Sequence, residues 1–214
     1  MVEVKICGLS TPETMAAALD ARADFVGLVF FPKSPRNVSL DQAAILADQA
    51  RGRARIVALT VDAGDVLLRT ICDRVWPDFI QAHGMETPER VAAIVALTGQ
   101  PVIKAIKVAR ADDVSAASAY SEVASLILYD AKAPETLCAS LPGGNGHAFD
   151  WSLLDGKRPP AFMLAGGLTI GNVARAIKVT GAPIVDVSSG VESAPGVKDI
   201  QLIRKFIEAA KRPR

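Results

Sequence analysis

Two kinds of segment alternate along the whole chain. One is a short, nearly continuous run of apolar and β-branched residues, and the other is a longer stretch, rich in Ala and Leu, with apolar positions at helical spacing. Continuous apolar runs are typical of strands whose two faces are both covered, as in parallel sheets. The predicted strands span Val2–Cys7, Phe25–Phe30, Arg55–Val61, Phe79–Ala82, Val102–Val108, Ala124–Tyr129, Ala161–Ala165 and Ile184–Val187.

Signals for helix starts lie between these strands. Thr11–Pro12 and Thr87–Pro88 each place a capping residue before a proline, whose missing N–H costs nothing in the first turn of a helix. Ser39 begins another helix in the same way, and the last helix is predicted over Val197–Lys211. Residues 131–160 form the longest irregular stretch, so the sixth helix is poorly marked.

Eight strand–helix units fit a closed parallel (β/α)8 TIM barrel, an α/β fold in which every crossover is right-handed. The prediction is one barrel domain over residues 1–214, which is compact beside the roughly 250 residues of a typical barrel. The alternative is an open, doubly wound sheet. That fold normally has a Gly-x-Gly-x-x-Gly turn after its first strand, where this chain has Cys7–Ser10.

Composition narrows the class of protein. Apolar residues make up 50% and charged residues 22%, which excludes a disordered chain. The charges are scattered and sum to +1, so we expect no nucleic acid partner, and no uncharged apolar run reaches the roughly 18 residues of a membrane helix. Three irregularly spaced cysteines and the lack of a signal-peptide pattern predict a cytoplasmic protein with free thiols, of which Cys72 and Cys138 are expected to be structural.

Reactive side chains follow the predicted strands. Because the carboxyl ends of all barrel strands open on one face, these residues should share one mouth. The connections on the opposite face carry ordinary turn residues, and this asymmetry favours an active site. The side chains in question are Cys7, Lys33, Arg36, Asp62, His83, Lys107, Asp130 and Asp186.

Cys7 is a candidate base or nucleophile, and Asp130 is a candidate acid. Lys5 lies two residues before Cys7 and so shares its strand face, where a cation would favour the thiolate; the alternative is an inert buried thiol. Asp130 ends a strongly apolar strand, where partial desolvation would keep it protonated for acid catalysis. The alternative for Asp130 is a helix cap or an ion pair with Lys132.

Arg36, His83 and Asp186 are candidate substrate contacts. Arg36 can bind a carboxylate with two parallel N–H groups, although a solvated loop arginine is the plainer interpretation. His83 fits either a substrate contact or a hydrogen-bonded residue of the rim. The chain has two histidines, far apart, and no paired Cys or His spacing, so we expect no metal and no cofactor.

The last two loops resemble a phosphate cradle. Glycines after the seventh strand let the backbone approach a ligand before a helix predicted near Ile170, and serines after the eighth strand offer N–H groups and hydroxyls. Barrels commonly bind phosphate at these two loops, although tight turns alone would also explain the glycines. The predicted phosphate-binding residues are Gly166, Gly167, Ser188, Ser189 and Gly190.

A series of motifs, in order along nearly the whole chain, resembles the phosphoribosylanthranilate isomerase family, whose members are (β/α)8 enzymes of tryptophan biosynthesis. Each motif is weak by itself, but the ordered set is specific. The motifs are Lys5–Gly8, Gly27–Arg36, Gln81–Gly84, Tyr129–Lys132, Gly143–Trp151, Leu164–Leu168 and Asp186–Glu192.

The resemblance implies an Amadori rearrangement of a phosphorylated aminosugar without a cofactor. It assigns Asp130 as the general acid, Cys7 as the general base and Arg36 as the group that holds the anthranilate carboxylate. The sequence departs from the family pattern at Thr60–Asp62, at Ala82 and at Ile170–Gly171. These departures bear on the fine substrate specificity and not on the reaction.

Two other functions remain possible at this point. A metal-dependent phosphosugar epimerase would need a cluster of His and carboxylate ligands at the strand ends. A non-catalytic phospholigand binder would keep the cradle without any need for Cys7 and Asp130. Self-association is left undetermined by the sequence.

Overall fold

The computed structural model describes residues 1–132, 149–155, 159 and 161–212. The predictions for Cys138, His147 and most of the Gly143–Trp151 motif therefore lie outside the described residues. Eight parallel strands close into one barrel in chain order, because β1 pairs with both β2 and β8. The predicted (β/α)8 barrel is confirmed, and the open sheet is wrong.

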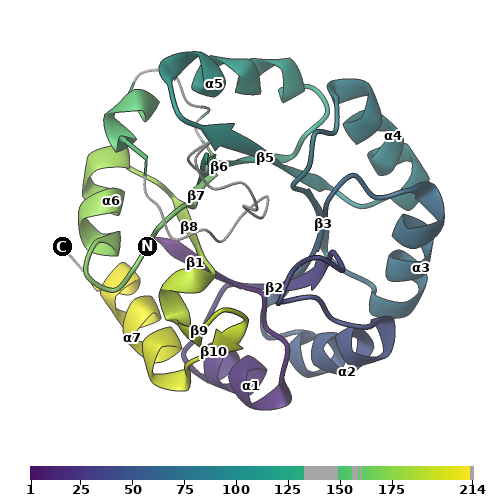
Figure 1. Ribbon diagram of the computed structural model, residues 1–214, viewed down its shortest axis with the longest axis horizontal. Coiled ribbons are helices and arrows are strands. Elements are labelled where there is room, and N and C mark those ends of the chain that lie inside the picture. Colours follow the sequence, from purple (N-terminus) through teal and green to yellow (C-terminus); the bar gives the residue numbers. More distant parts are fainter. Residues whose placement is uncertain (133–148, 156–158, 160, 213–214) are drawn as a thin grey trace.

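Figure 1 shows the ring of strands enclosed by helices. The strands are β1 (Glu3–Cys7), β2 (Phe25–Phe30), β3 (Arg55–Thr60), β4 (Phe79–Ala82), β5 (Val102–Val108), β6 (Leu126–Ala131), β7 (Phe162–Leu164), β8 (Ile184–Val187), β9 (Glu192–Ala194) and β10 (Val197–Lys198). The α-helices are α1 (Pro12–Asp20), α2 (Leu40–Ala50), α3 (Asp65–Val75), α4 (Pro88–Thr98), α5 (Ala111–Ser115), α6 (Val173–Thr180) and α7 (Ile200–Lys211). Three 3₁₀ helices are also described: η1 (Ala116–Tyr120), η2 (Trp151–Leu154) and η3 (Ser189–Val191).

The predicted caps are present. Thr11, Ser39 and Thr87 each accept a hydrogen bond from the backbone N–H three residues further on. Pro12 and Pro88 stand at the first helical positions that follow two of these caps. Each cap satisfies an N–H that the helix itself cannot pair, which fixes where the helix begins.

The last helix begins later than predicted. Asp199 caps α7 by accepting hydrogen bonds from the backbone N–H groups of Gln201 and Leu202, so the helix starts at Ile200 instead of Val197. Val197–Lys198 instead forms β10, which pairs antiparallel with β9 in a small hairpin beside the barrel. This change removes Lys198 from the helix and places it near the barrel mouth.

Among the other boundaries that differ from the predicted ones, two affect the site. β6 extends to Ala131, so Asp130 lies inside the strand and its direction is fixed by the pleat. α6 begins at Val173 instead of near Ile170, because Asn172 first closes a turn by accepting from the Thr169 N–H and donating to the Gly167 carbonyl.

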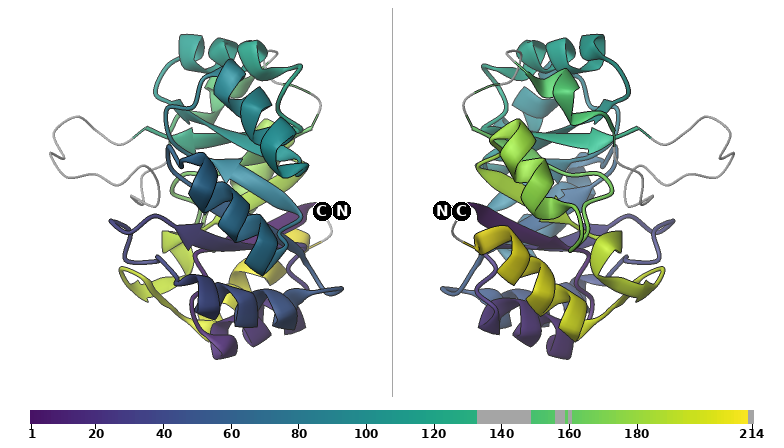
Figure 2. Two further views of the ribbon diagram at one scale, coloured as in Figure 1. Left: turned by 90° about the vertical axis from the view of Figure 1, so that its right-hand side faces the viewer. Right: turned by 90° about the vertical axis from the view of Figure 1, so that its left-hand side faces the viewer.

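Alternation along the strands divides the core into two parts. In β1, Val4 and Ile6 face outward into the large cluster beneath the helices, whereas Lys5 and Cys7 face the barrel interior. The lower interior is apolar, and its buried residues are Phe25, Val57, Ile103, Ala105, Leu128, Met163, Ala165 and Ile184. Figure 2 shows the N-terminus at one end of the barrel and the β9–β10 hairpin at the other, the end where the strands finish.

The loop after β7 is packed against β6 so closely that only glycine fits. Gly166 has a φ of 83°, and a Cβ there would clash with the backbone nitrogen of Ala131. Gly99, which ends α4, has a φ of 69° but open space around it. The two positions therefore share a left-handed backbone conformation, but only Gly166 is closely packed against its neighbours.

We expect Gly166→Ala to destabilise the protein more than Gly99→Ala. The left-handed conformation alone should cost about 1–2 kcal/mol at either position, and the clash adds to this only at Gly166. Urea denaturation, monitored by circular dichroism, measures both variants. Equal costs would show that the loop after β7 can move away from β6.

Candidate active site

Cys7 ends β1 and lies inside the barrel mouth. It is 4% exposed and packs with Val29 and Leu59. Gly27 stands opposite Cys7 in β2, and a Cβ at Gly27 would lie 2.9 Å from Cys7 Sγ. The missing side chain of Gly27 therefore makes the space that the thiol occupies.

Burial decides the ionisation of the thiol. Burial raises the pKa of Cys7 above its ordinary value, and the nearby charges of Lys5 and Lys198 oppose this only in part. The sequence led us to expect that the cation would favour the thiolate, and Lys5 does act in that direction. The net direction is the reverse, because desolvation of the thiolate outweighs the attraction.

Lys5 is a fully buried ammonium in the middle of the barrel. Its Nζ donates to Asp186 Oδ1 at 3.0 Å and to Gln81 Oε1 at 2.8 Å. Burial acts to lower the pKa of Lys5, but Asp186 and Cys7 outweigh burial, so the pKa is raised and the amine stays charged. The expectation that Lys5 and Cys7 share one strand face is confirmed.

Asp130 faces His83 across the mouth. His83 Nε2 lies 3.1 Å from Asp130 Oδ2, and both side chains are almost fully buried. On its other edge, His83 Nδ1 lies 2.7 Å from Gln81 Nε2. Asp130 therefore takes part in a network inside the barrel, and it caps none of the helices that the structure describes.

Arg36 is a buried member of the site. Its Nε donates to Glu192 Oε1 at 2.7 Å and its Nη2 to Glu192 Oε2 at 2.9 Å. Gly8 makes this packing possible, since a Cβ at Gly8 would lie 2.7 Å from Arg36 Cδ. The interpretation of Arg36 as a solvated loop residue is wrong, because its exposed fraction is 6%.

Lys198 and Glu192 were not found from the sequence. Lys198 Nζ donates to Glu192 Oε1 at 2.6 Å and to Ser188 Oγ at 3.0 Å, and Ser188 Oγ donates to the Cys7 carbonyl at 3.1 Å. The predicted final helix concealed Lys198, although the Asp199 cap marks the true start of that helix. These contacts join the loop after β8 to the end of β1.

The two proposed phosphate loops lie against each other. Gly166 and Gly167 both have positive φ, and a Cβ at Gly190 would clash with the Leu168 carbonyl. Ser189 begins η3 directly after Ser188. Gly166 and Gly190 thus have a packing reason, and the close approach of Gly190 to Leu168 brings the two loops together.

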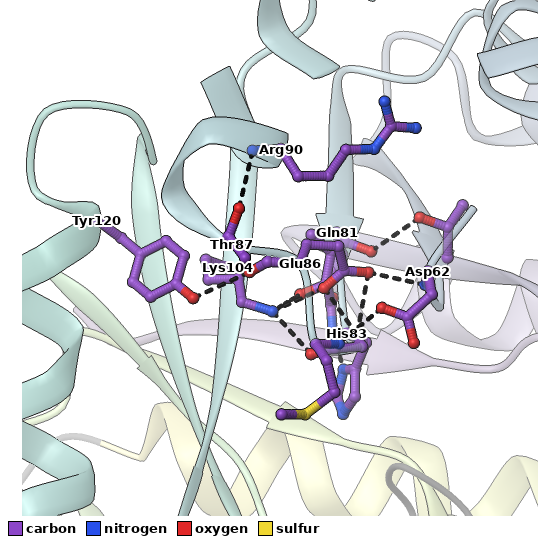
Figure 3. Close-up of polar contacts among 12 residues, drawn as sticks. Asp62, Gln81, His83, Glu86, Thr87, Arg90, Lys104 and Tyr120 are labelled. Carbon is purple, nitrogen blue, oxygen red and sulfur yellow. Dashed lines mark hydrogen bonds and ion pairs between the residues drawn. The ribbon is translucent and has the colours of Figure 1, made fainter. Parts of the chain in front are cut away.

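A buried ion pair supports the loop that carries His83. Lys104 Nζ lies 2.7 Å from Glu86 Oε2 and donates to the Gly84 carbonyl at 2.8 Å (Figure 3). Glu86 in turn accepts from the backbone N–H groups of Asp62 and Gly84 at 2.9 Å each. Burial opposes the charge on Glu86, but these partners outweigh it and lower the pKa of Glu86.

The described residues offer neither a metal site nor a membrane span. No three His, Cys, Asp or Glu side chains there come together as a metal site requires. No helix in the same part of the chain is long and apolar enough to cross a membrane.

The fold and the site define a class: a (β/α)8-barrel enzyme with a buried thiol, a buried carboxyl group and two glycine-containing loops at the carboxyl ends of its strands. The family model for N-(5'-phosphoribosyl)anthranilate isomerase matches residues 4–209. The chain therefore belongs to the N-(5'-phosphoribosyl)anthranilate isomerase family, as its motifs indicated.

Similar proteins agree with this assignment. The chain is 56% identical to the isomerase of Rhodopseudomonas palustris strain HaA2, over 98% of this chain and 96% of that protein. It is 50% identical to the isomerase of Parvibaculum lavamentivorans, over 99% of both chains. The crystal structure of the isomerase from Thermotoga maritima has a TM-score of 0.87 at 36% identity, with 99% of both chains covered.

The ion pairs of Glu192 generate a prediction about acid. Burial opposes the charge of Glu192, but hydrogen bonds and charges from Arg36 and Lys198 lower the pKa of Glu192 from 4.5 to about 2. A depressed pKa contributes stability above pH 4.5, and this stability is lost as pH falls toward 2.

Glu192→Gln should therefore lower the free energy of unfolding by roughly 1–2 kcal/mol at neutral pH, and the difference from the parent protein should shrink as pH falls below 4.5. Urea denaturation at a series of pH values measures it. Glu13→Gln, in the exposed first turn of α1, controls for the loss of a surface carboxylate. A difference that stays constant with pH would contradict the prediction.

Proposed function

We propose that this chain converts N-(5'-phosphoribosyl)anthranilate into 1-(2-carboxyphenylamino)-1-deoxyribulose 5-phosphate, an Amadori rearrangement in tryptophan biosynthesis. The observation that carries the residue roles is the burial of Cys7, at the end of β1, and Asp130, on β6, at one mouth of the barrel. A base and an acid at opposite sides of one mouth suit a reaction that moves protons at two points of one sugar.

The reaction requires two proton transfers. Asp130 donates a proton to the ribose ring oxygen while the anthranilate nitrogen lone pair opens the ring, and the C1–O bond breaks to give a protonated Schiff base. Cys7, as thiolate, then removes the C2 proton, and the electron pair forms the enolamine. The enolamine tautomerises to the ketone, so substrate and product have the same atoms and no cofactor enters.

The two ends of the substrate carry negative charge. Arg36 is assigned to the anthranilate carboxylate, for which its planar guanidinium is suited. The loops with Gly166, Gly167, Ser188, Ser189 and Gly190 are assigned to the phosphate, whose oxygens accept from backbone N–H groups. His83 and Asp186 complete the set of proposed substrate contacts, although in this structure each bonds another protein side chain. A cytoplasmic location and the lack of a nucleic acid partner stay predictions from the sequence.

Removing either proposed catalytic group should reduce turnover. We expect Cys7→Ala and Asp130→Asn each to lower kcat about 10²-fold or more. The asparagine can still accept from His83 Nε2, so the second variant removes the transferable proton and keeps that contact. Loss of substrate fluorescence measures the rate.

Matched controls for this experiment are Cys72→Ala and Asp112→Asn, which replace a half-buried thiol on α3 and an exposed carboxylate on α5. Both control variants should have the kcat of the parent protein. A variant of Cys7 or Asp130 with nearly parental kcat would refute the role given to that residue.

The ionisation of Cys7 can be followed directly. The difference in ultraviolet thiolate absorbance between the parent and Cys7→Ala should rise with a midpoint above pH 9.0, since burial raises the pKa of this thiol above that ordinary value. Lys5→Met removes a cation that opposes burial, so the transition should move to still higher pH. Lys33→Met, in an exposed loop, should leave it in place. A transition below pH 9.0 in the parent would contradict this description.

A further inference from the structure

One chain of hydrogen bonds crosses the barrel from β8 to β6. Asp186 Oδ1 accepts from Lys5 Nζ at 3.0 Å, and Lys5 Nζ also donates to Gln81 Oε1 at 2.8 Å. Gln81 Nε2 lies 2.7 Å from His83 Nδ1, and His83 Nε2 lies 3.1 Å from Asp130 Oδ2. All five side chains are buried.

The direction of each bond follows from the first one. An ammonium group can only donate, so the oxygen of the Gln81 amide must face Lys5, and its NH₂ must face His83. The NH₂ group can only donate, so His83 Nδ1 must be the acceptor and carries no proton. The ring proton is therefore on Nε2, where it is donated to Asp130, and the ring is neutral.

The opposite orientation of the Gln81 amide, with Oε1 and Nε2 exchanged, is unfavourable. It would place the NH₂ of Gln81 against the ammonium of Lys5, so that two donors would face each other in a buried site. Lys5 is itself held in place, because its Nζ also donates to Asp186 Oδ1 at 3.0 Å. The orientation of the amide is thus set by a charge that does not touch His83.

Three other charged groups near this chain, Glu86, Lys104 and Asp62, have partners of their own. Glu86 and Lys104 form the ion pair under the β4–α4 loop, and Asp62 Oδ1 accepts from the Met85 N–H at 2.7 Å (Figure 3). Lys107 lies beside Asp130 in the β5–β6 register. Gln81 and Asp130 are the groups that meet the two ring nitrogens of His83.

We propose that Gln81 is a positioning residue that, oriented by Lys5, keeps His83 neutral with its proton on Nε2 and so preserves Asp130 as a proton donor. The proposal rests on the role of Asp130 as general acid. A neutral ring that donates to Oδ2 leaves the carboxylic proton on Oδ1 for the substrate. An imidazolium in the same place would stabilise the carboxylate form of Asp130 and remove the transferable proton.

Nitrogen NMR of the imidazole rings tests the proposal without reference to activity. The chain has two histidines, so His147→Gln assigns the spectrum. At neutral pH, His83 should show an unprotonated Nδ1 and a protonated Nε2. In Gln81→Glu, the new carboxylate accepts from Nδ1–H, so both nitrogens should carry protons. A proton on Nδ1 in the parent, or a neutral ring in Gln81→Glu, would overturn the proposal.

Activity supplies the second readout. Gln81→Glu should lower kcat about tenfold or more while KM changes less than about threefold, since the acid is impaired and no substrate contact is removed. Gln201→Glu, at an exposed position in α7, is the matched control and should retain the parental kcat. A protonated His83 ring with parental kcat would overturn the link to Asp130, whereas the role of Asp130 itself is tested separately by Asp130→Asn.

Gln81→Met covers the case in which the buried carboxylate prevents folding. It keeps the length of the side chain but removes both hydrogen bonds, so His83 should populate the tautomer with a proton on Nδ1. Circular dichroism confirms folding before the NMR measurement. An unchanged Nε2–H tautomer in this variant would show that Gln81 does not determine the state of the ring.

Discussion

A buried ammonium holds the site together. Placing Lys5 in the barrel interior costs several kcal/mol unless the ammonium is paired and hydrogen-bonded, and Asp186 and Gln81 both accept from it. Because Lys5 stands on β1 and these two partners stand on β8 and β4, one charge fixes the relative positions of three strands near the mouth. The orientation of the Gln81 amide follows from this single group, which also opposes in part the effect of burial on the Cys7 thiol.

The interior of the barrel separates packing from chemistry by depth. Phe25, Val57 and Ile103 fill the lower part with apolar side chains, and the polar residues lie above them, toward the carboxyl ends of the strands. The alternation of side chains makes this possible, because a step of two residues along one strand moves from a packing position to a polar one. The apolar layer also excludes water from below, which strengthens the electrostatic interactions of Lys5.

Much of this arrangement was predictable from the sequence. The apolar runs predicted the eight strands, and the caps predicted where three of the helices begin. The positions that follow the strands predicted Cys7, Arg36, His83 and Asp130 as site residues. Pairing across the barrel was not predictable, because the contact between Lys5 and Asp186 joins residues 181 positions apart and depends on the closure of β1 against β8. Lys198 was missed for a local reason: the helical pattern continues across it, and only the Asp199 cap marks the break.

The rim of the mouth is built from ion pairs that hold loops, and this explains why so many charges are buried there. Lys104 and Glu86 fix the loop after β4, whereas Glu192 joins Arg36 to Lys198 and so connects the loop after β2 with the hairpin after β8. A buried pair adds little net stability over an apolar pair, but losing one partner is costly. Such pairs therefore define one loop geometry more than they strengthen the fold, and a site that must direct two protons to two atoms of one sugar depends on that geometry.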